Sequence, residues 1–542
     1  MINESKAKEI MPRVITNNID VQYTHRFSLR KLLGNICSGG MVTLIQSIAV
    51  IVVMPIYIDR LGIQGIGILG VFILVTNLVR MFDLGLCTTI SKQVAQAREH
   101  EQAHFCIPNI LRTYELIFIA IGVVTVSMIF LIAFYLPLDW FSTDVYHGLL
   151  PRDILLLAGG AAIFRWLASL YQTILIGQEH IVQNSILRFV DILLYHGVGV
   201  AILLASTNGP MYFFCWIAVN SLIHLVISIF YVASKLPGSY IRAQFQIPIL
   251  KESYKFAAAI AGILIISTIF LQADRFLVML FTDLKTLGHY TLALTISTSV
   301  ISLCAFPVLS ATFPRFAMLV KAKDKIEITR QYYLSILLTL LLIMPALAFI
   351  FTQADRIIFL WTDDIEATRY LAPILIFVTA GPILNAVAVP AFSILMAAEE
   401  TKFVMTVSVI ILLTASVLYI ISLWHFDLRM LGISVITCYS INIIPLLLRV
   451  HRRYMIFPIR RFILELFLPI TLLSFLVAYV MQQFLIVSSE TRIAAILILA
   501  CKAFLLVIVV SALYFSLAGL IRSKRSLEPF TWKDLVSYDS SS

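Results

Sequence analysis

Charged side chains within long hydrophobic segments are the residues of this chain whose types and spacing suggest chemistry. Arg80 and Asp83 are three residues apart, and so are Arg188 and Asp191, which would put each pair on one helix face. Arg165 has no acidic residue close to it in the sequence. A charge inside a bilayer costs about 2.5–3.5 kcal/mol on insertion scales, so such side chains normally face a partner or a water-filled cavity.

The three arginines favour one kind of ligand. A guanidinium group donates two parallel, charge-assisted hydrogen bonds, and these match the oxygens of a pyrophosphate group. Only Asp83 and Asp191 are at hand to neutralise Arg80, Arg165 and Arg188, so we expect a surplus positive charge that binds an anion in a shared cavity. The alternative is that Arg80–Asp83 and Arg188–Asp191 are ion pairs that only fix helix packing.

A second candidate group consists of Gln272, Asp274 and Arg275, toward the outer part of a later hydrophobic segment. We expect these side chains to line the same cavity. The alternative is that Asp274 and Arg275 only stabilise the rim of their helix, since neighbours in sequence point about 100° apart.

Glycine and proline inside hydrophobic segments mark candidate hinges. These residues are Gly39, Gly40, Gly381, Pro382 and Pro390. Such positions let a helix bend, because neighbouring helices or water satisfy the backbone groups that the bend frees. Close helix packing through small residues is the alternative reading of the glycines.

Several classes of function lack their sequence signals. No Walker motif is present, and the seven cysteines are dispersed without a C-x-x-C pair, so we expect no ATP hydrolysis, metal site, cofactor or catalytic residue. Coupling to the membrane potential or to a proton or sodium gradient is the expected drive. The longest outer loop, 353–369, is too short for a catalytic domain, which disfavours a membrane polymerase or glycosyltransferase.

The elements that position these residues are membrane-spanning helices. Of the 542 residues, 60% are hydrophobic and only 13% are charged, which does not suit a water-soluble protein. A span needs about 20 apolar residues, and about fourteen segments meet that length. Their expected limits are 32–58, 67–90, 113–136, 153–177, 185–206, 211–233, 256–281, 288–313, 331–352, 370–397, 403–424, 431–449, 463–487 and 493–519.

Basic residues orient the spans. If residues 1–31 are cytoplasmic, alternating segments hold 28 of the 40 Lys and Arg on that side and 7 on the other. The positive-inside rule therefore predicts a multi-pass protein with both termini in the cytoplasm, and no nucleic-acid partner is needed to explain the net charge of +10. The expected divisions are segment 1–31, spans 32–233, linker 234–255, spans 256–449, basic loop 450–462, two further spans within 463–520, and tail 521–542.

The first twelve spans contain a repeat. With an offset of 223, TTISKQVAQAR (88–98) aligns with ATFPRFAMLVK (311–321) and places Lys92 on Arg315. With an offset of 220, TILIGQE (173–179) aligns with SILMAAE (393–399) and places Glu179 on Glu399. Six spans in each copy is an even number, so the copies are parallel and related by an axis along the membrane normal.

Four stretches resemble a known family. LLGNICSGG (32–40), YIDRLGIQGIGILGVFILV (57–75), MFDLGLCTTISKQVA (81–95) and FLQADRFLVMLFTDLKTLGHYTLAL (270–294) are similar to the polysaccharide-transporter branch of the multidrug/oligosaccharidyl-lipid/polysaccharide exporters. The resemblance implies an all-α integral membrane protein with two parallel six-helix lobes around a central cavity, plus two extra C-terminal helices.

The resemblance also implies a function without bond chemistry. Members of that branch flip a polyprenyl-pyrophosphate-linked oligosaccharide across the bacterial cytoplasmic (inner) membrane by alternating access, for O-antigen, capsule or exopolysaccharide. Expected partners are this lipid-linked substrate, membrane lipids, a polysaccharide polymerase and a chain-length regulator, with the chain itself a monomer. A cation-coupled multidrug exporter of the same superfamily is the alternative, although it would favour an acidic cavity.

Overall fold

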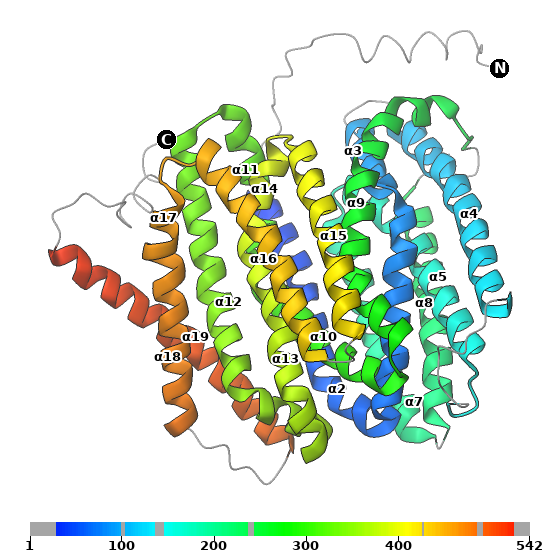
Figure 1. The fold of residues 1–542 in the computed structure, drawn as a ribbon. Coiled ribbons are helices and arrows are strands. Elements are labelled where there is room, and N and C mark those ends of the chain that lie inside the picture. Colours follow the sequence, from blue (N-terminus) through cyan, green and yellow to red (C-terminus); the bar gives the residue numbers. More distant parts are fainter. Residues whose placement is uncertain are drawn as a thin grey trace.

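The chain folds into one bundle of long helices. The computed structural model describes residues 29–98, 103–135, 146–206, 208–236, 243–424, 428–484 and 492–524, and every regular element in these ranges is a helix. The elements are α2 (Leu29–Arg80), η1 (Met81–Asp83), α3 (Leu86–Arg98), α4 (Ala103–Tyr135), α5 (Pro151–Gly177), α6 (Ile181–Leu193), η2 (Leu194–Val198), α7 (Gly199–Ala205), α8 (Gly209–Lys235), α9 (Ile247–Phe281), α10 (Leu284–Cys304), α11 (Phe306–Ala322), α12 (Lys325–Thr362), α13 (Ile365–Asn385), η4 (Ala386–Ala388), α14 (Val389–Ala397), α15 (Thr401–Trp424), α16 (Leu428–Arg453), α17 (Ile459–Phe462), η5 (Ile463–Phe467), α18 (Leu468–Phe484) and α19 (Arg492–Lys524). The predicted all-α membrane fold is confirmed (Figure 1).

The number of spans agrees with the sequence once α2 is divided. Thirteen helical segments of the described residues are long and apolar enough to cross a membrane, and the first runs over 45 residues, Gly39–Asp83. At 1.5 Å per residue this segment is about 67 Å long, twice the thickness of a hydrocarbon core. Gly62 interrupts it with φ 66° and ψ 176°, a left-handed conformation that favours glycine. The kink therefore joins two crossings.

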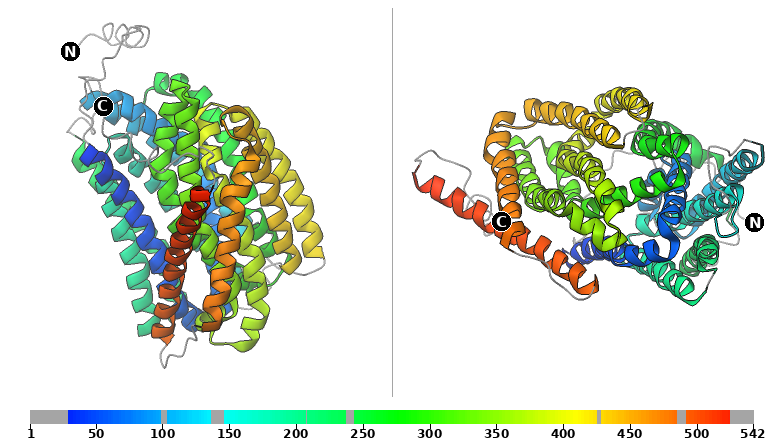
Figure 2. Two further views of the ribbon diagram at one scale, coloured as in Figure 1. Left: turned by 90° about the vertical axis from the view of Figure 1, so that its left-hand side faces the viewer. Right: turned by 60° about the horizontal axis from the view of Figure 1, so that its bottom comes forward.

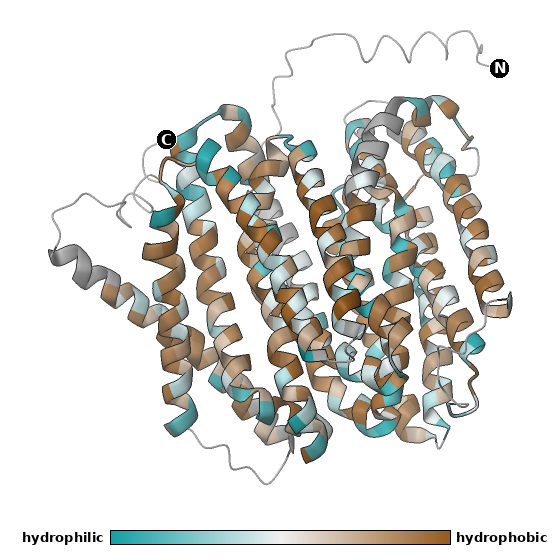
Figure 3. Ribbon diagram, in the orientation of Figure 1, coloured by the Kyte–Doolittle hydropathy of each residue, from teal (hydrophilic) through white to brown (hydrophobic). Residues whose placement is uncertain are grey.

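The two ends of the bundle are named by the elements that lie there. The end with α3 and α11 is called the α3–α11 end, and the opposite end, where α2 kinks, is called the Gly62 end (Figure 1). Hydrophobic residues dominate the long outer helices α4, α15 and α16 (Figure 3). This distribution suits lipid contact along their length.

Two predicted spans end earlier than the sequence indicated. Span 67–90 is wrong at its second boundary, because α2 ends at Arg80 and Leu84 adopts a left-handed conformation with φ 47° before α3 begins. The carboxylate of Asp83 accepts the backbone N–H of Cys87 at 3.1 Å, which stabilises the start of α3. Span 288–313 is likewise divided, between α10 and α11, at Ala305.

One turn occurs twice, at the spacing that the repeat predicts. Glu179 follows α5 with φ 59°, and Glu399 follows α14 with φ 56°. The two turns also share their backbone hydrogen bonds, since the third residue after each helix, His180 or Glu400, donates to a carbonyl five residues earlier. The offset of 220 is therefore confirmed at this turn.

The packing of the two copies is also alike. α3 packs on α4 and α5, and α11 packs on α12 and α14. In the first copy α5 packs on α8, and in the second α13 packs on α16. Lys92 and Arg315 are both exposed on these corresponding short helices. We call α2–α8 the first lobe and α9–α16 the second lobe.

The second copy of the turn carries an ion cluster. Glu400 accepts hydrogen bonds from Arg449 Nε at 2.8 Å, Arg453 Nη1 at 2.9 Å and Tyr454 Oη at 2.7 Å. Partial burial favours the neutral acid, but these three donors outweigh it and hold the pKa of Glu400 below its ordinary value. The cluster ties the α14–α15 turn to the end of α16.

Two large hydrophobic cores divide the bundle unevenly. The first, called the joint core, contains buried residues of both lobes. The first lobe contributes only residues of its Gly62 half, within 54–74, 146–161 and 203–217. The second core fills the α3–α11 half of the first lobe and takes no described residue beyond Leu250. Helices α18 and α19 pack on α12 through a small third core, and α19 lies along the edge of the bundle (Figure 2).

Candidate functional site

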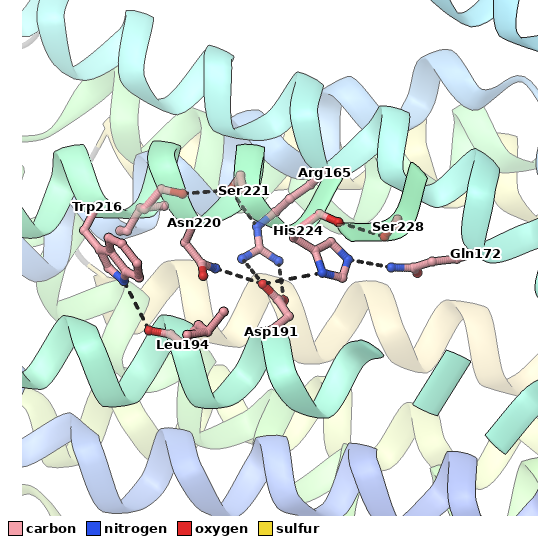
Figure 4. A network of polar contacts seen from close by, with 10 residues as sticks. Arg165, Gln172, Asp191, Leu194, Trp216, Asn220, Ser221, His224 and Ser228 are labelled. Carbon is pink, nitrogen blue, oxygen red and sulfur yellow. Dashed lines mark hydrogen bonds and ion pairs between the residues drawn. The ribbon is translucent and has the colours of Figure 1, made fainter. Parts of the chain in front are cut away.

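Arg165 forms the centre of a polar network inside the first lobe (Figure 4). Its Nη1 and Nη2 donate to Asp191 Oδ2 and Oδ1 at 3.0 and 3.3 Å, and its Nε donates to Ser221 Oγ at 3.1 Å. The Tyr195 ring covers the guanidinium at 5.5 Å. No acidic residue is near Arg165 in the sequence, and its partner Asp191 lies 26 residues away, brought to it by packing of α5 on α6.

Three more polar side chains complete this network. Asn220 Nδ2 donates to Asp191 Oδ1 at 2.8 Å, and His224 Nδ1 lies 3.9 Å from the same oxygen. His224 Nε2 is 2.6 Å from Gln172 Nε2. Sequence reasoning did not assign Asn220 and Gln172 to a site, although Asn220 and His224 are four residues apart in a hydrophobic span. That spacing on one helix face was the available signal.

The network borders an irregular helical turn. Directly after α6, residues Leu194–Val198 form a π-helix, a feature that frequently occurs at functional sites. In this turn the Leu194 carbonyl accepts a hydrogen bond from Trp216 Nε1 at 3.2 Å. In the same turn, His196 Nδ1 contacts Tyr57 Oη of α2 at 3.1 Å. Aromatic side chains thus hold this turn against two neighbouring helices.

The Arg165–Asp191 pair changes the expected role of Arg188. Asp191 gives its two oxygens to Arg165, so the predicted alternative of an Arg188–Asp191 ion pair is wrong at hydrogen-bonding distance. Arg188 is close enough to Arg80 to be repelled by its positive charge and close enough to Asp191 to be attracted by its negative charge. Within the described residues, neither guanidinium has a hydrogen bond or ion pair. We call Arg80 and Arg188 the cationic pair.

Arg80 also differs from its expected setting. It is the last residue of α2, and Asp83 lies in the following 3₁₀ turn, where its carboxylate attracts the Arg80 guanidinium without forming an ion pair within 4 Å. Arg80 is exposed, whereas Arg188 is half-buried about 10 Å along the axis from the start of α6. Packing of α2 on α6 brings them together at the α3–α11 end of the first lobe.

The second candidate group is a separate cluster in the second lobe. Asp274 is buried and accepts Tyr290 Oη at 2.6 Å and the Arg275 backbone N–H at 2.7 Å. Arg275 is buried as well, and its Nε lacks a partner, as does the buried Oε1 of Gln272. These residues lie within α9 and its contact with α10, and not in the Arg165 network. Their predicted role in binding stays a prediction.

The hinge candidates fall in different settings. Gly39 and Gly40 have helical conformations inside α2, and a Cβ added at either would meet nothing within 4 Å. A Cβ at Gly381 would lie 2.9 Å from the ring of Tyr439, which indicates close packing of α13 on α16. The helix that contains Pro382 is interrupted a few residues later by η4, and Pro390 lies in the first turn after that interruption.

The chemistry of the site is therefore that of charge and hydrogen bonding. In the part of the chain that the structure describes, no three His, Cys, Asp or Glu side chains are grouped as metal ligands would be. Arg165 forms an ion pair with Asp191, whereas Arg80 and Arg188 are attracted by Asp83 and Asp191 but form no ion pair with them. This arrangement suits an anion at the α3–α11 end of the first lobe.

Comparison with known proteins places the chain in context. The family described as polysaccharide biosynthesis protein matches residues 32–320. No curated protein matches the chain.

Solved structures of membrane transporters share the fold. The structure of the lipid II flippase MurJ in an inward closed conformation has a TM-score of 0.67 at 16% identity, covering 89% of this chain and 99% of that one. An inward-facing multidrug resistance MATE family transporter of the MOP superfamily gives 0.58 at 14%, with 76% and 98% covered. The MATE multidrug transporter DinF-BH gives 0.56 at 14%, with 79% and 96% covered.

Proposed function

The chain belongs to the polysaccharide biosynthesis protein family, and on that premise we propose that it flips a lipid-linked oligosaccharide across the membrane. The substrate would be a sugar unit on a polyprenyl-pyrophosphate carrier, destined for O-antigen, capsule or exopolysaccharide. The two lobes would move it by alternating access, without forming or breaking a bond. The likeness of the fold to a lipid II flippase supports a substrate of this kind.

The cationic pair carries the proposal. Arg80 and Arg188 repel each other, and a pyrophosphate between them would replace that repulsion by attraction. Arg165 is held by Asp191 and Ser221, so it would orient the site from within the lobe and not bind the substrate directly. The apolar carrier would remain in the bilayer while its charged head contacts the pair.

A substitution of Arg188 tests the proposal. In cells that depend on this chain for their surface glycan, Arg188→Ala should abolish export while the protein remains at its normal level in the membrane. Arg188→Lys should restore export only in part, because lysine lacks the two-pronged donor. Arg152→Ala is the control, since Arg152 is exposed at the Gly62 end and pairs with its sequence neighbour Asp153.

Two results would contradict this assignment. Normal glycan export by Arg188→Ala would remove the anion site from the cationic pair. Loss of the Arg188→Ala protein from the membrane, with Arg188→Lys fully active, would make Arg188 a structural residue.

Multidrug export is the second candidate, because MATE transporters share the fold. The cationic pair does not favour it, since a positive site repels cationic drugs. Cells lacking the chain would become sensitive to drugs and keep their surface glycan if this alternative were correct.

The setting of the protein is part of the proposal. Because most Lys and Arg fall on one side, we place the α3–α11 end and both termini in the cytoplasm of a bacterial cell, with the chain in the inner membrane. A polysaccharide polymerase and a chain-length regulator are the proposed partners, and the chain would act as a monomer. The membrane potential or a proton or sodium gradient would supply the drive, at about 2.3 kcal/mol per charge and 100 mV.

A further inference from the structure

The two lobes are joined unequally at the two ends of the bundle. At the Gly62 end they share the joint core, which contains Ile66 and Leu69 of α2 together with Leu287 and Tyr290 of α10. At the α3–α11 end the first lobe has a core of its own, to which the second lobe adds, of its described residues, only Ile249 and Leu250 at the start of α9. The larger hydrophobic contact between the lobes is therefore the one at the Gly62 end.

Glycines allow the backbones to approach each other in this contact. α2 packs directly on α10. A Cβ added at Gly67 would collide with the backbone carbonyl of Leu284, and one at Gly288 would collide with the carbonyl of Ile63. A Cβ at Gly70 would collide with the side chain of Thr291. The contact thus leaves no room for a single added methyl group.

The neighbouring backbone is fixed from within the first lobe. Tyr146, between α4 and α5, donates its hydroxyl to the Leu61 carbonyl at 2.5 Å, directly before the Gly62 kink. A Cβ at Gly65 would lie within 2.5 Å of the same hydroxyl. The start of the second crossing of α2 is therefore bonded to its own lobe while it touches the other one.

We propose that the contact of α2 with α10 at the Gly62 end is the seal that closes the transport path on that side. The lobes would part there, backbone from backbone, whenever the path opens to that side. The inference rests on the proposed transport by alternating access, but its test measures the opening itself and requires no substrate.

The experiment adds a methyl group to the seal by a glycine-to-alanine substitution, which we call a wedge variant. Leu284 is buried at the contact, so Leu284→Cys, in a variant whose seven native cysteines are replaced by serine, serves as a reporter for a membrane-impermeant maleimide added from the Gly62 side, in proteoliposomes of one orientation. Adding Gly70→Ala or Gly288→Ala should raise the labelling rate about tenfold, because an overpacked contact disfavours the closed state. Gly160→Ala is the matched control, since a Cβ at Gly160 meets nothing within 4 Å.

A compensating change separates the seal from general damage. Thr291→Ala removes the atom that a Cβ at Gly70 would strike, so adding it to Gly70→Ala should return labelling toward the parent rate. Size-exclusion chromatography confirms that each variant is folded. If a wedge variant is not recovered folded, the labelling rates of two cysteines are compared in the protein without a wedge. Lys285 is the exposed neighbour of Leu284, and Leu284→Cys should react with the maleimide about tenfold more slowly than Lys285→Cys.

Three outcomes would overturn the seal. The first is that Gly70→Ala and Gly288→Ala are both folded and are labelled at the parent rate. The second is that Thr291→Ala does not lower the labelling rate of Gly70→Ala. The third is that Leu284→Cys reacts as fast as Lys285→Cys in the parent. Because none of these readouts depends on glycan export, a failure of the proposed substrate would leave the test of the seal unaffected.

Discussion

Removing Arg165 should expose how much of the first lobe depends on its ion pair with Asp191. Arg165→Met deletes two hydrogen bonds to the carboxylate and one to Ser221, and leaves Asp191 with Asn220 as its close donor. Breaking a buried pair costs about 3–5 kcal/mol. The Arg165 side chain is 28% exposed, so water can partly replace the hydrogen bonds that Asp191 loses. We therefore expect the free energy of unfolding to fall by the lower limit, about 3 kcal/mol.

A double-mutant cycle isolates the pair. Asp191→Leu should cost a similar amount, because it leaves Arg165 without its acid. The double variant Arg165→Met/Asp191→Leu removes both charges and should lose only about 1 kcal/mol, which makes the coupling energy several kcal/mol. The free energy of unfolding is measured by SDS titration in mixed micelles, followed by circular dichroism.

The control for this cycle is an exposed pair. Arg152 lies 3.6 Å from Asp153, with side chains 50% and 38% exposed, so Arg152→Met should cost less than about 0.5 kcal/mol. The reasoning is refuted if Arg165→Met is as mild as Arg152→Met, or if the two single substitutions in the network add without coupling.

Two further predictions concern the ends of the bundle. The depressed pKa of Glu400 means that its ionised form stabilises the folded state above about pH 4.5, and that this stabilisation disappears as the pH falls through the folded-state pKa. The advantage of the parent over Glu400→Gln in melting temperature should therefore shrink on acidification from about pH 6, and a constant difference would contradict it. Tyr146→Phe should lower the free energy of unfolding, measured by SDS titration, by about 1–3 kcal/mol, because the Leu61 carbonyl loses its donor. The control Tyr135→Phe, at an exposed site, should leave the free energy of unfolding unchanged. Equal effects of the two substitutions would show that the hydrogen bond does not contribute to stability.

The sequence alone determined the helices of this protein and most of their limits. In a bilayer every backbone N–H and C=O needs a partner within the protein, so a long apolar run has to be helical. The sequence also predicted the repeat at Glu179 and Glu399, because a left-handed turn between two helices depends on the residues next to it in the sequence. The helix break after Arg80 was missed, since the left-handed conformation of Leu84 lies within an apolar run that reads as continuous helix.

Only the tertiary structure decided which charges meet. Arg188 and Asp191 are neighbours on one helix, yet Asp191 pairs with Arg165, 26 residues away, because α5 packs on α6 and brings the Arg165 guanidinium within hydrogen-bonding distance of both carboxylate oxygens. Sequence spacing limits which residues share a helix face, but it does not fix how one helix is rotated against another. The same holds for Gly67 and Gly288, whose place in a contact between lobes follows from the approach of two backbones distant in sequence.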